Sequence, residues 1–263
     1  MLQQLKMPMV LPFFHHAVIE QVWVVLAALA LGAIAGLTLW PLARWIPVTL
    51  IEDDGGRDDS EPQQLWLGRE DEYTGGASDA MGYLLILTLG CSLMAGACVS
   101  RFGFTWGALA AYVFATVLLV LAVIDAQWRL LPDLLTIPLI WAGLLANIVL
   151  QFASLPAAIL GAVIGYGLLW LLFLPARLAG QEDGIGHGDF KLYAAVGAWL
   201  GWLALPQVFL LSLAAGFIYL LAVRLRGKEG SRPSPFGPFI VIAALLTLCN
   251  GTPLNPWIHL IPI

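Results

Sequence analysis

Long runs of apolar residues make up most of this sequence, and short polar segments separate them. A helix needs about 20 apolar residues to cross ~30 Å of hydrocarbon, and in lipid its backbone groups must hydrogen-bond to one another. The pattern therefore predicts an all-α, polytopic integral membrane protein with about eight transmembrane helices. The predicted spans are 18–42, 80–99, 104–124, 134–153, 157–176, 190–204, 207–223 and 237–258.

The sixth predicted span is short, and Pro206 separates it from the seventh. Because proline interrupts a helix, these two spans are expected to form either a tight helical hairpin or one long kinked helix. Glycines in the fifth and sixth spans would also let neighbouring membrane helices approach closely, because glycine has no side chain. These glycines are Gly161, Gly165, Gly167, Gly197 and Gly201.

Basic residues are distributed unevenly among the connections between the spans. Nine Lys and Arg residues lie in four alternate segments, whereas the segments of the other side contain only Lys6 and Arg101. An excess of Lys and Arg marks the cytoplasmic loops of membrane proteins. The prediction is therefore that both termini face outward and that four segments face the cytoplasm. These segments are 43–79, 125–133, 177–189 and 224–236.

The composition excludes several other classes of protein. Charged residues make up 11% of the chain and hydrophobic residues 60%, whereas soluble domains carry about 25% charged residues, so lipid is the expected surrounding. A net charge of -5 with scattered basic residues gives no face for nucleic acid. The cysteines, Cys91, Cys98 and Cys249, lie in apolar runs without a CxxC pair, so we expect small packed side chains and no disulfide framework.

Residues 43–79 form the one sizeable polar segment and contain ten of the seventeen Asp and Glu residues. The segment also has two Gly-Gly pairs and few residues to bury, which predicts a flexible, solvated loop. A second interpretation is that its negative charge attracts a basic segment of a partner.

Two acids outside this loop interrupt apolar sequence at a membrane edge. Asp125 closes the third predicted span and Asp189 precedes the sixth, both at the predicted cytoplasmic face. A carboxylate near hydrocarbon is costly unless it has a partner, so it suggests a function. Two carboxylates brought together can share one proton, one activating water while the other donates to a carbonyl or a leaving amine.

A structural role for these acids is the alternative. Asp189 could cap a helix N-terminus, and Asp133, which follows Pro132, fits that role even better. Asp125 has no such explanation, because it lies at a predicted helix C-terminus, where the helix dipole disfavours an anion. The glycines around His187 indicate either backbone held close to another group or backbone with positive φ, beside Asp189.

Three stretches together resemble a known family. They are Ile124–Pro138, the GxGD-containing Gly186–Leu192 and Pro235–Pro238, and their order resembles that of the type IV prepilin peptidases, membrane aspartyl proteases of the GxGD class. The resemblance covers residues from about 120 to 240. It implies that Asp125 and Asp189 are catalytic. Supporting or substrate-binding positions would be Pro132, Asp133, Gly186, His187, Gly188 and Lys191, with Asp133 as a structural acid.

The resemblance also implies a function. It suggests a bacterial inner-membrane endopeptidase that cuts the short basic leader from a type IV prepilin or a type II secretion pseudopilin at the cytoplasmic face. The peptidase reaction would need no cofactor. Residues 1–79 would comprise an interfacial segment, the first span and the acidic loop, and residues 80–263 the membrane-embedded peptidase domain.

The first loop departs from the family pattern. Most bacterial members carry two CxxC pairs there, a zinc-binding element associated with N-methylation of the new pilin terminus by S-adenosylmethionine. Residues 43–79 contain no cysteine. A closed zinc site wants four Cys or His ligands, so we expect no zinc, and S-adenosylmethionine only if a methyltransferase activity exists.

Other functions compete with this interpretation. One is an intramembrane aspartyl protease with other substrates, such as signal-peptide remnants. Another is a non-enzymatic ion or proton carrier, in which membrane Asp residues form a relay, and this would place the carboxylates near mid-membrane. A pure scaffold for a secretion apparatus is third, and it leaves the GxGD motif unexplained.

Overall fold

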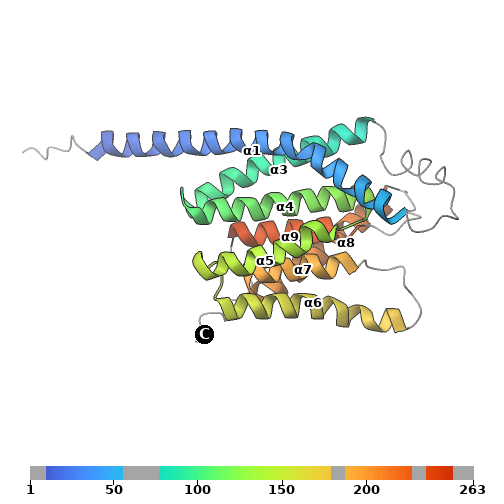
Figure 1. The fold of residues 1–263 in the computed structure, drawn as a ribbon. Helices are drawn as coiled ribbons and strands as arrows, with labels where there is room; N and C mark the ends of the chain where they lie inside the picture. Colours follow the sequence, from blue (N-terminus) through green and yellow to red (C-terminus); the bar gives the residue numbers. More distant parts are fainter. Residues whose placement is uncertain (1–9, 56–76, 179–186, 227–234, 251–263) are drawn as a thin grey trace, which may run out of the picture.

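The fold is a bundle of α-helices, which confirms the predicted all-α class (Figure 1). The computed structural model describes residues 10–55, 77–178, 187–226 and 235–250. Within these ranges there are eight α-helices, one short 3-10 helix and no strand. The α-helices are α1 Val10–Gly55, α3 Ala77–Phe102, α4 Trp106–Trp128, α5 Asp133–Val149, α6 Leu155–Leu178, α7 His187–Leu200, α8 Leu205–Leu225 and α9 Gly237–Asn250; the 3-10 helix, η1, is Trp202–Ala204.

Each described α-helix coincides with one predicted span, but their lengths differ. Five stretches among the described residues are long and apolar enough to cross a membrane: Val22–Ile46, Ala80–Phe102, Trp106–Trp128, Leu155–Pro175 and Trp202–Leu225. Helices α5 and α9 are apolar but shorter, and α7 has 14 residues. The protein is a multi-pass membrane protein that contains both long spans and shorter apolar helices.

Helix α1 is longer than the sequence pattern predicted. It extends over 46 residues to Gly55, so the first part of the predicted 43–79 loop is helical. The sequence from Trp45 to Ile51 stays mostly apolar, and the helix continues through Pro47 within it. Residues 56–76 of the predicted loop lie outside the described residues.

Successive helices run in opposite directions, and their connections gather at two ends of the bundle (Figure 1). The short connections after α3, α5 and α7 lie at one end, where they line a common cavity of about 730 Å³ with Arg101 and Leu248. The end of α4 and the starts of α5, α7 and α9 therefore lie together at the opposite end. This grouping agrees with the predicted alternation of the loops.

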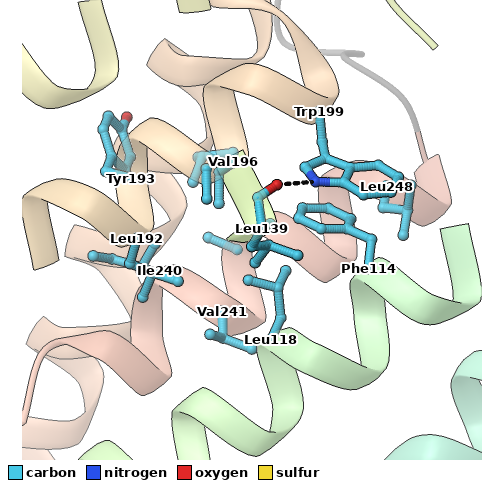
Figure 2. Packing of buried hydrophobic residues seen from close by; sticks show 14 of the residues in the cluster. Phe114, Leu118, Leu139, Leu192, Tyr193, Val196, Trp199, Ile240, Val241 and Leu248 are labelled. Carbon is cyan, nitrogen blue, oxygen red and sulfur yellow. Dashed lines mark hydrogen bonds between the residues drawn. The ribbon is translucent and has the colours of Figure 1, made fainter. Parts of the chain in front are cut away.

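Helix α7 is covered by the neighbouring helices, and its side chains are buried from Leu192 to Trp199. The ring of Trp199 stacks on Phe114 of α4 with 4.6 Å between centroids, and its indole N–H donates to the Leu139 carbonyl of α5 at 2.9 Å (Figure 2). The Asn147 side chain donates to the carbonyl oxygens of Ala198 and Trp199. These contacts hold the C-terminal end of α7, whose last carbonyls have no partner within the helix.

Glycines bring α6 and α7 into backbone contact, as predicted. A Cβ added at Gly161 would collide with the Gly197 carbonyl, and one at Gly197 with the Gly161 carbonyl. At Gly165 the added atom would lie 2.7 Å from the Tyr193 carbonyl oxygen, whereas Gly167 has open space around it. The close approach of α6 and α7 therefore depends on Gly161, Gly165 and Gly197. Gly167 takes no part in it.

The predicted sixth and seventh spans are two separate helices. Helix α7 ends at Leu200, and Gly201 follows with φ +79°, a conformation that L side chains rarely adopt. Pro206 lies in the first turn of α8, where a missing N–H costs nothing. The alternative of one long helix kinked at Pro206 is therefore wrong, because the helix already ends before Gly201, five residues before the proline.

Substitution of the contact glycine Gly161 should destabilise the bundle. Gly161→Ala should lower the free energy of unfolding by about 1–3 kcal/mol, because backbone atoms of α7 must move to admit the methyl group. Gly167→Ala is the matched control on the same helix and should change stability by less than about 0.5 kcal/mol. Unfolding of both variants in one detergent measures the difference, and equal effects would contradict the packing argument.

Candidate active site

Asp125 lies in the last turn of α4 and is almost fully buried, with 6% of its surface exposed. Its backbone carbonyl accepts the N–H of Arg129, the left-handed residue that ends the helix. Its carboxylate Oδ2 accepts the backbone N–H of Gly237, the first residue of α9, at 3.0 Å. A helix N-terminus presents free N–H groups and a partial positive charge, so α9 stabilises an anion that the end of α4 disfavours.

Glycine at position 237 lets the Asp125 carboxylate approach the start of α9. A Cβ built there would lie 2.5 Å from Oδ2 of Asp125 and 3.0 Å from its Cγ. The sequence pattern singled out the Pro235–Pro238 motif, but it did not place Gly237 among the site residues. The sequence does contain a signal for this role of Gly237, namely a glycine directly before a proline at the expected start of a helix.

Asp189 lies in the first turn of α7 and exposes 6% of its surface. Its Oδ1 atom is buried and has no hydrogen-bond partner among the described residues. Burial, and secondarily the negative charge of Asp125, raise the pKa of Asp189 from its usual 3.8 to about 7. The two aspartates are therefore close enough to influence each other's ionisation. Helix α7 begins at His187, so Asp189 lies within the first turn and not at the expected cap position.

The second glycine of the GxGD motif has a packing role. A Cβ at Gly188 would lie 2.6 Å from Cβ of Leu131, in the connection between α4 and α5. Pro132 is the next residue and forms the N-cap of α5, where its carbonyl accepts the N–H groups of Leu135 and Thr136. This glycine therefore allows the start of α7 to lie directly against the segment that follows Asp125.

Asp133 and Lys191 form an ion pair beside the two buried aspartates. Nζ of Lys191 lies 2.6 Å and 2.7 Å from the two carboxylate oxygens of Asp133. Both side chains are partly exposed, at 28% for Lys191 and 55% for Asp133. The cap role expected of Asp133 is wrong, since Pro132 is the N-cap and Asp133 instead joins the start of α5 to α7. Lys191 was expected as a separate supporting residue, and its partner is a finding of the structure.

Two other expected site residues are placed only in part. Gly186 lies outside the described residues, and His187 is described only as the first residue of α7.

The cysteines Cys91, Cys98 and Cys249 are free and pack among apolar side chains. Within the described ranges, no three His, Cys, Asp or Glu side chains gather as metal ligands. The absence of zinc stays a prediction.

This geometry defines a class of protein: a multi-pass helical membrane protein with two buried, interacting aspartates at one end of the bundle. The pattern of the type IV leader peptidase family matches residues 112–221 of the chain, a range that includes both aspartates. No solved structure matches the chain.

Several relatives bear the name prepilin leader peptidase/N-methyltransferase. That of Aeromonas hydrophila is 47% identical over 153 residues, which cover 58% of this chain and 53% of the relative. That of Pseudomonas aeruginosa is 44% identical over 63% of this chain and 58% of the relative. That of Dickeya chrysanthemi is 37% identical over 74% of this chain and 68% of the relative.

This chain belongs to the type IV leader peptidase family, and the resemblance inferred from its motifs is confirmed. The chain spans about half the length of the first relatives it matches. Their shared name includes N-methyltransferase, so it gives no support to the expectation that methylation is absent.

The raised pKa of Asp189 predicts how stability changes with pH. Because its pKa is higher in the folded chain, at about 7, than the usual 3.8, folding favours the protonated form. That contribution is fully present below about pH 4 and is lost as the pH rises through about 7. Asp189→Asn cannot ionise, so its stability relative to the unsubstituted protein should rise across this window and then level off.

Thermal unfolding of both proteins at a series of pH values measures this difference. Asp133→Asn is the control, because it removes a carboxylate that is exposed. A flat difference for Asp189→Asn between about pH 4 and about pH 7 would show that burial of the carboxylate has no cost in the folded protein.

Proposed function

We propose that this protein is a membrane aspartic endopeptidase that removes the short basic leader from type IV prepilins or type II secretion pseudopilins. The observation that carries the proposal is the pair of buried carboxylates, Asp125 and Asp189, that α4 and α7 bring together. Family membership and the names of the relatives support the substrate class.

The chemistry follows from the pair. One carboxylate accepts a proton from water, whose oxygen attacks the scissile carbonyl, while the other donates to the carbonyl oxygen. Neither a covalent enzyme intermediate nor a cofactor is needed for these proton transfers. Asp133 and Lys191 carry the opposite charges of an ion pair and support the position of α7 from outside the pair.

The location of the pair suits a substrate embedded in the same membrane. Asp125 and Asp189 lie at one end of the bundle, where a leader at the end of a hydrophobic helix would be presented. A proton carrier is expected to hold its carboxylates near mid-membrane, so this placement favours hydrolysis. Cleavage of other membrane substrates remains the alternative within the same chemistry.

We place the protein in the bacterial inner membrane, with the aspartate pair at the cytoplasmic side and both termini outward. The nine-to-two distribution of basic residues supports this orientation.

We also propose that the chain divides into residues 1–79 and 80–263, the second being the peptidase part. The two parts are in contact, because α1 packs against α3, with Cβ positions at Gly32 and Gly36 within 2.6 Å of α3 backbone atoms.

Removal of either aspartate should abolish cleavage. Asp125→Asn and Asp189→Asn should each lower the rate by about 10²–10⁴-fold, because each removes one half of the acid-base pair. Asp133→Asn, the matched control on α5, should retain substantial activity because its carboxylate belongs to an exposed ion pair. The measurement is cleavage of a purified prepilin by each folded variant in detergent or liposomes, and nearly full activity in either of the first two would contradict the proposal.

Labelling of introduced cysteines should confirm the orientation. Cysteines at Gly55 and Ser231 should react with a membrane-impermeant reagent from the same side, opposite to a cysteine at Arg101, because the basic loops face the cytoplasm. Whole cells and inverted vesicles give the two sides. Reaction of the Gly55 and Ser231 positions from opposite faces would overturn the topology.

We further propose that this chain cleaves without methylating its product and without zinc. The lack of any cysteine in residues 43–79 supports this, although the names of the relatives do not. Mass spectrometry of a pilin cleaved in the presence of S-adenosylmethionine should find an unmodified new N-terminus, and elemental analysis should find no zinc. Stoichiometric methylation by the purified chain, or about one zinc per chain that survives mild chelation, would refute the respective part.

A further inference from the structure

The two buried aspartates differ in their hydrogen bonding. Oδ2 of Asp125 accepts a backbone N–H, whereas Oδ1 of Asp189 has no partner among the described residues. Both residues are 6% exposed, so bulk water does not remove this difference in hydrogen bonding. A buried carboxylate with an N–H donor is stabilised as an anion, and a buried carboxylate oxygen without a donor is costly unless the group is protonated.

The first turn of α9 offers a single N–H to the site. Pro238 has no N–H, and the N–H groups of Phe239 and Ile240 donate to the Phe236 carbonyl. That leaves the Gly237 amide, which points to Asp125 at the positive end of a 14-residue helix. The donor is therefore directed to one aspartate of the pair and not shared between them.

The surrounding charges act in the same sense. Burial acts against ionisation of both carboxylates, but Asp125 has two opposing contributions, the Gly237 N–H and the positive charge of Arg129, the C-cap of α4. Helix α9 carries no charged residue. On α5 the nearest acid, Asp133, is paired with Lys191 of α7. Burial and the charge of Asp125 raise the pKa of Asp189 to about 7, which agrees with a proton held on Asp189.

We propose that Asp125 is the ionised general base, that Asp189 is the protonated general acid, and that the Gly237 amide is the positioning group that fixes this division. The assignment rests on the proposed peptidase function. It divides between the two residues the roles that the sequence leaves open.

The reaction then proceeds in two balanced steps. Asp125 takes a proton from water as the water oxygen bonds to the scissile carbonyl carbon, and Asp189 gives its proton to the carbonyl oxygen, which forms a gem-diol. In the second step the C–N bond breaks. Asp125 passes its proton to the leaving nitrogen, and one diol hydroxyl returns a proton to Asp189, so the new carboxyl end and the free amine leave both aspartates in their starting states.

The pH profile of kcat/KM tests the role of Gly237. Its acid limb reports ionisation of the base in the free enzyme, and its basic limb reports loss of the proton from the acid. Gly237→Ala keeps the backbone N–H but places a methyl group against Oδ2 of Asp125, which displaces the carboxylate from this donor, so the acid limb should move up by about one to two pH units while the basic limb stays. Gly167→Ala, at a helix position with open space, should leave both limbs in place.

Two outcomes of this experiment would overturn the proposal. Movement of the basic limb in place of the acid limb would show that the Gly237 amide acts on the general acid and not on the general base. A fall in rate with both limbs unchanged would show that Gly237 acts through packing alone.

A second measurement needs neither substrate nor a folded Gly237 variant. Infrared titration of the whole protein near about pH 6 should show the carbonyl stretch of a buried, protonated carboxylic acid. Asp189→Asn should remove the component of this band that titrates at about pH 7. Asp125→Asn should keep it, because burial is the larger cause of the raised pKa of Asp189.

The reverse pattern, or no such band in the unsubstituted protein, would overturn the division of roles. If the bands behave as expected but no prepilin or pseudopilin is cleaved, the proposed function fails while the difference in protonation stands. The two failures are therefore distinguishable.

Discussion

The hydrogen bond between the Gly237 amide and Asp125 is the contact on which the site depends. It joins the start of α9 to the end of α4, two helix ends that are far apart in sequence. Asp125 lies where its own helix disfavours an anion, so a buried carboxylate at this position requires a donor from elsewhere. The glycine, the proline after it and the location of α9 are explained together by this requirement.

The position of the second aspartate depends on packing around α7. At its C-terminal end the helix is held by Asn147 and by the Trp199 indole, and along its length by backbone contact with α6. At the other end Gly188 lies against Leu131, and Lys191 pairs with Asp133. Asp189 is thus carried by a helix that is fixed at both ends, and the proposed exchange of protons with Asp125 would need such a fixed position.

Much of this arrangement could be predicted from sequence because it has a compositional signal. Apolar runs indicated each described α-helix, and the rarity of acids in such runs singled out Asp125 and Asp189. The remainder depends on properties that residue types do not reveal. The donor at Gly237 is a backbone N–H, which every non-proline residue possesses, and the partner of Lys191 follows from how α5 meets α7. The loop expected over 43–79 is helical as far as Gly55, because hydropathy marks the extent of a membrane span and not the end of its helix.

The shortness of α7 has a consequence for water. Fourteen residues rise about 21 Å, which is roughly 9 Å less than the hydrocarbon thickness of a typical bilayer. Gly201 ends this helix beside a cavity of about 730 Å³, and Asp189 lies at its other end. At least one end of α7 then lies below the surface of a bilayer of that thickness, and hydration of this end or local thinning of the lipid would bring water to it. A hydrolytic water could then arrive from the adjacent aqueous phase over a few ångströms, without a channel through the bundle.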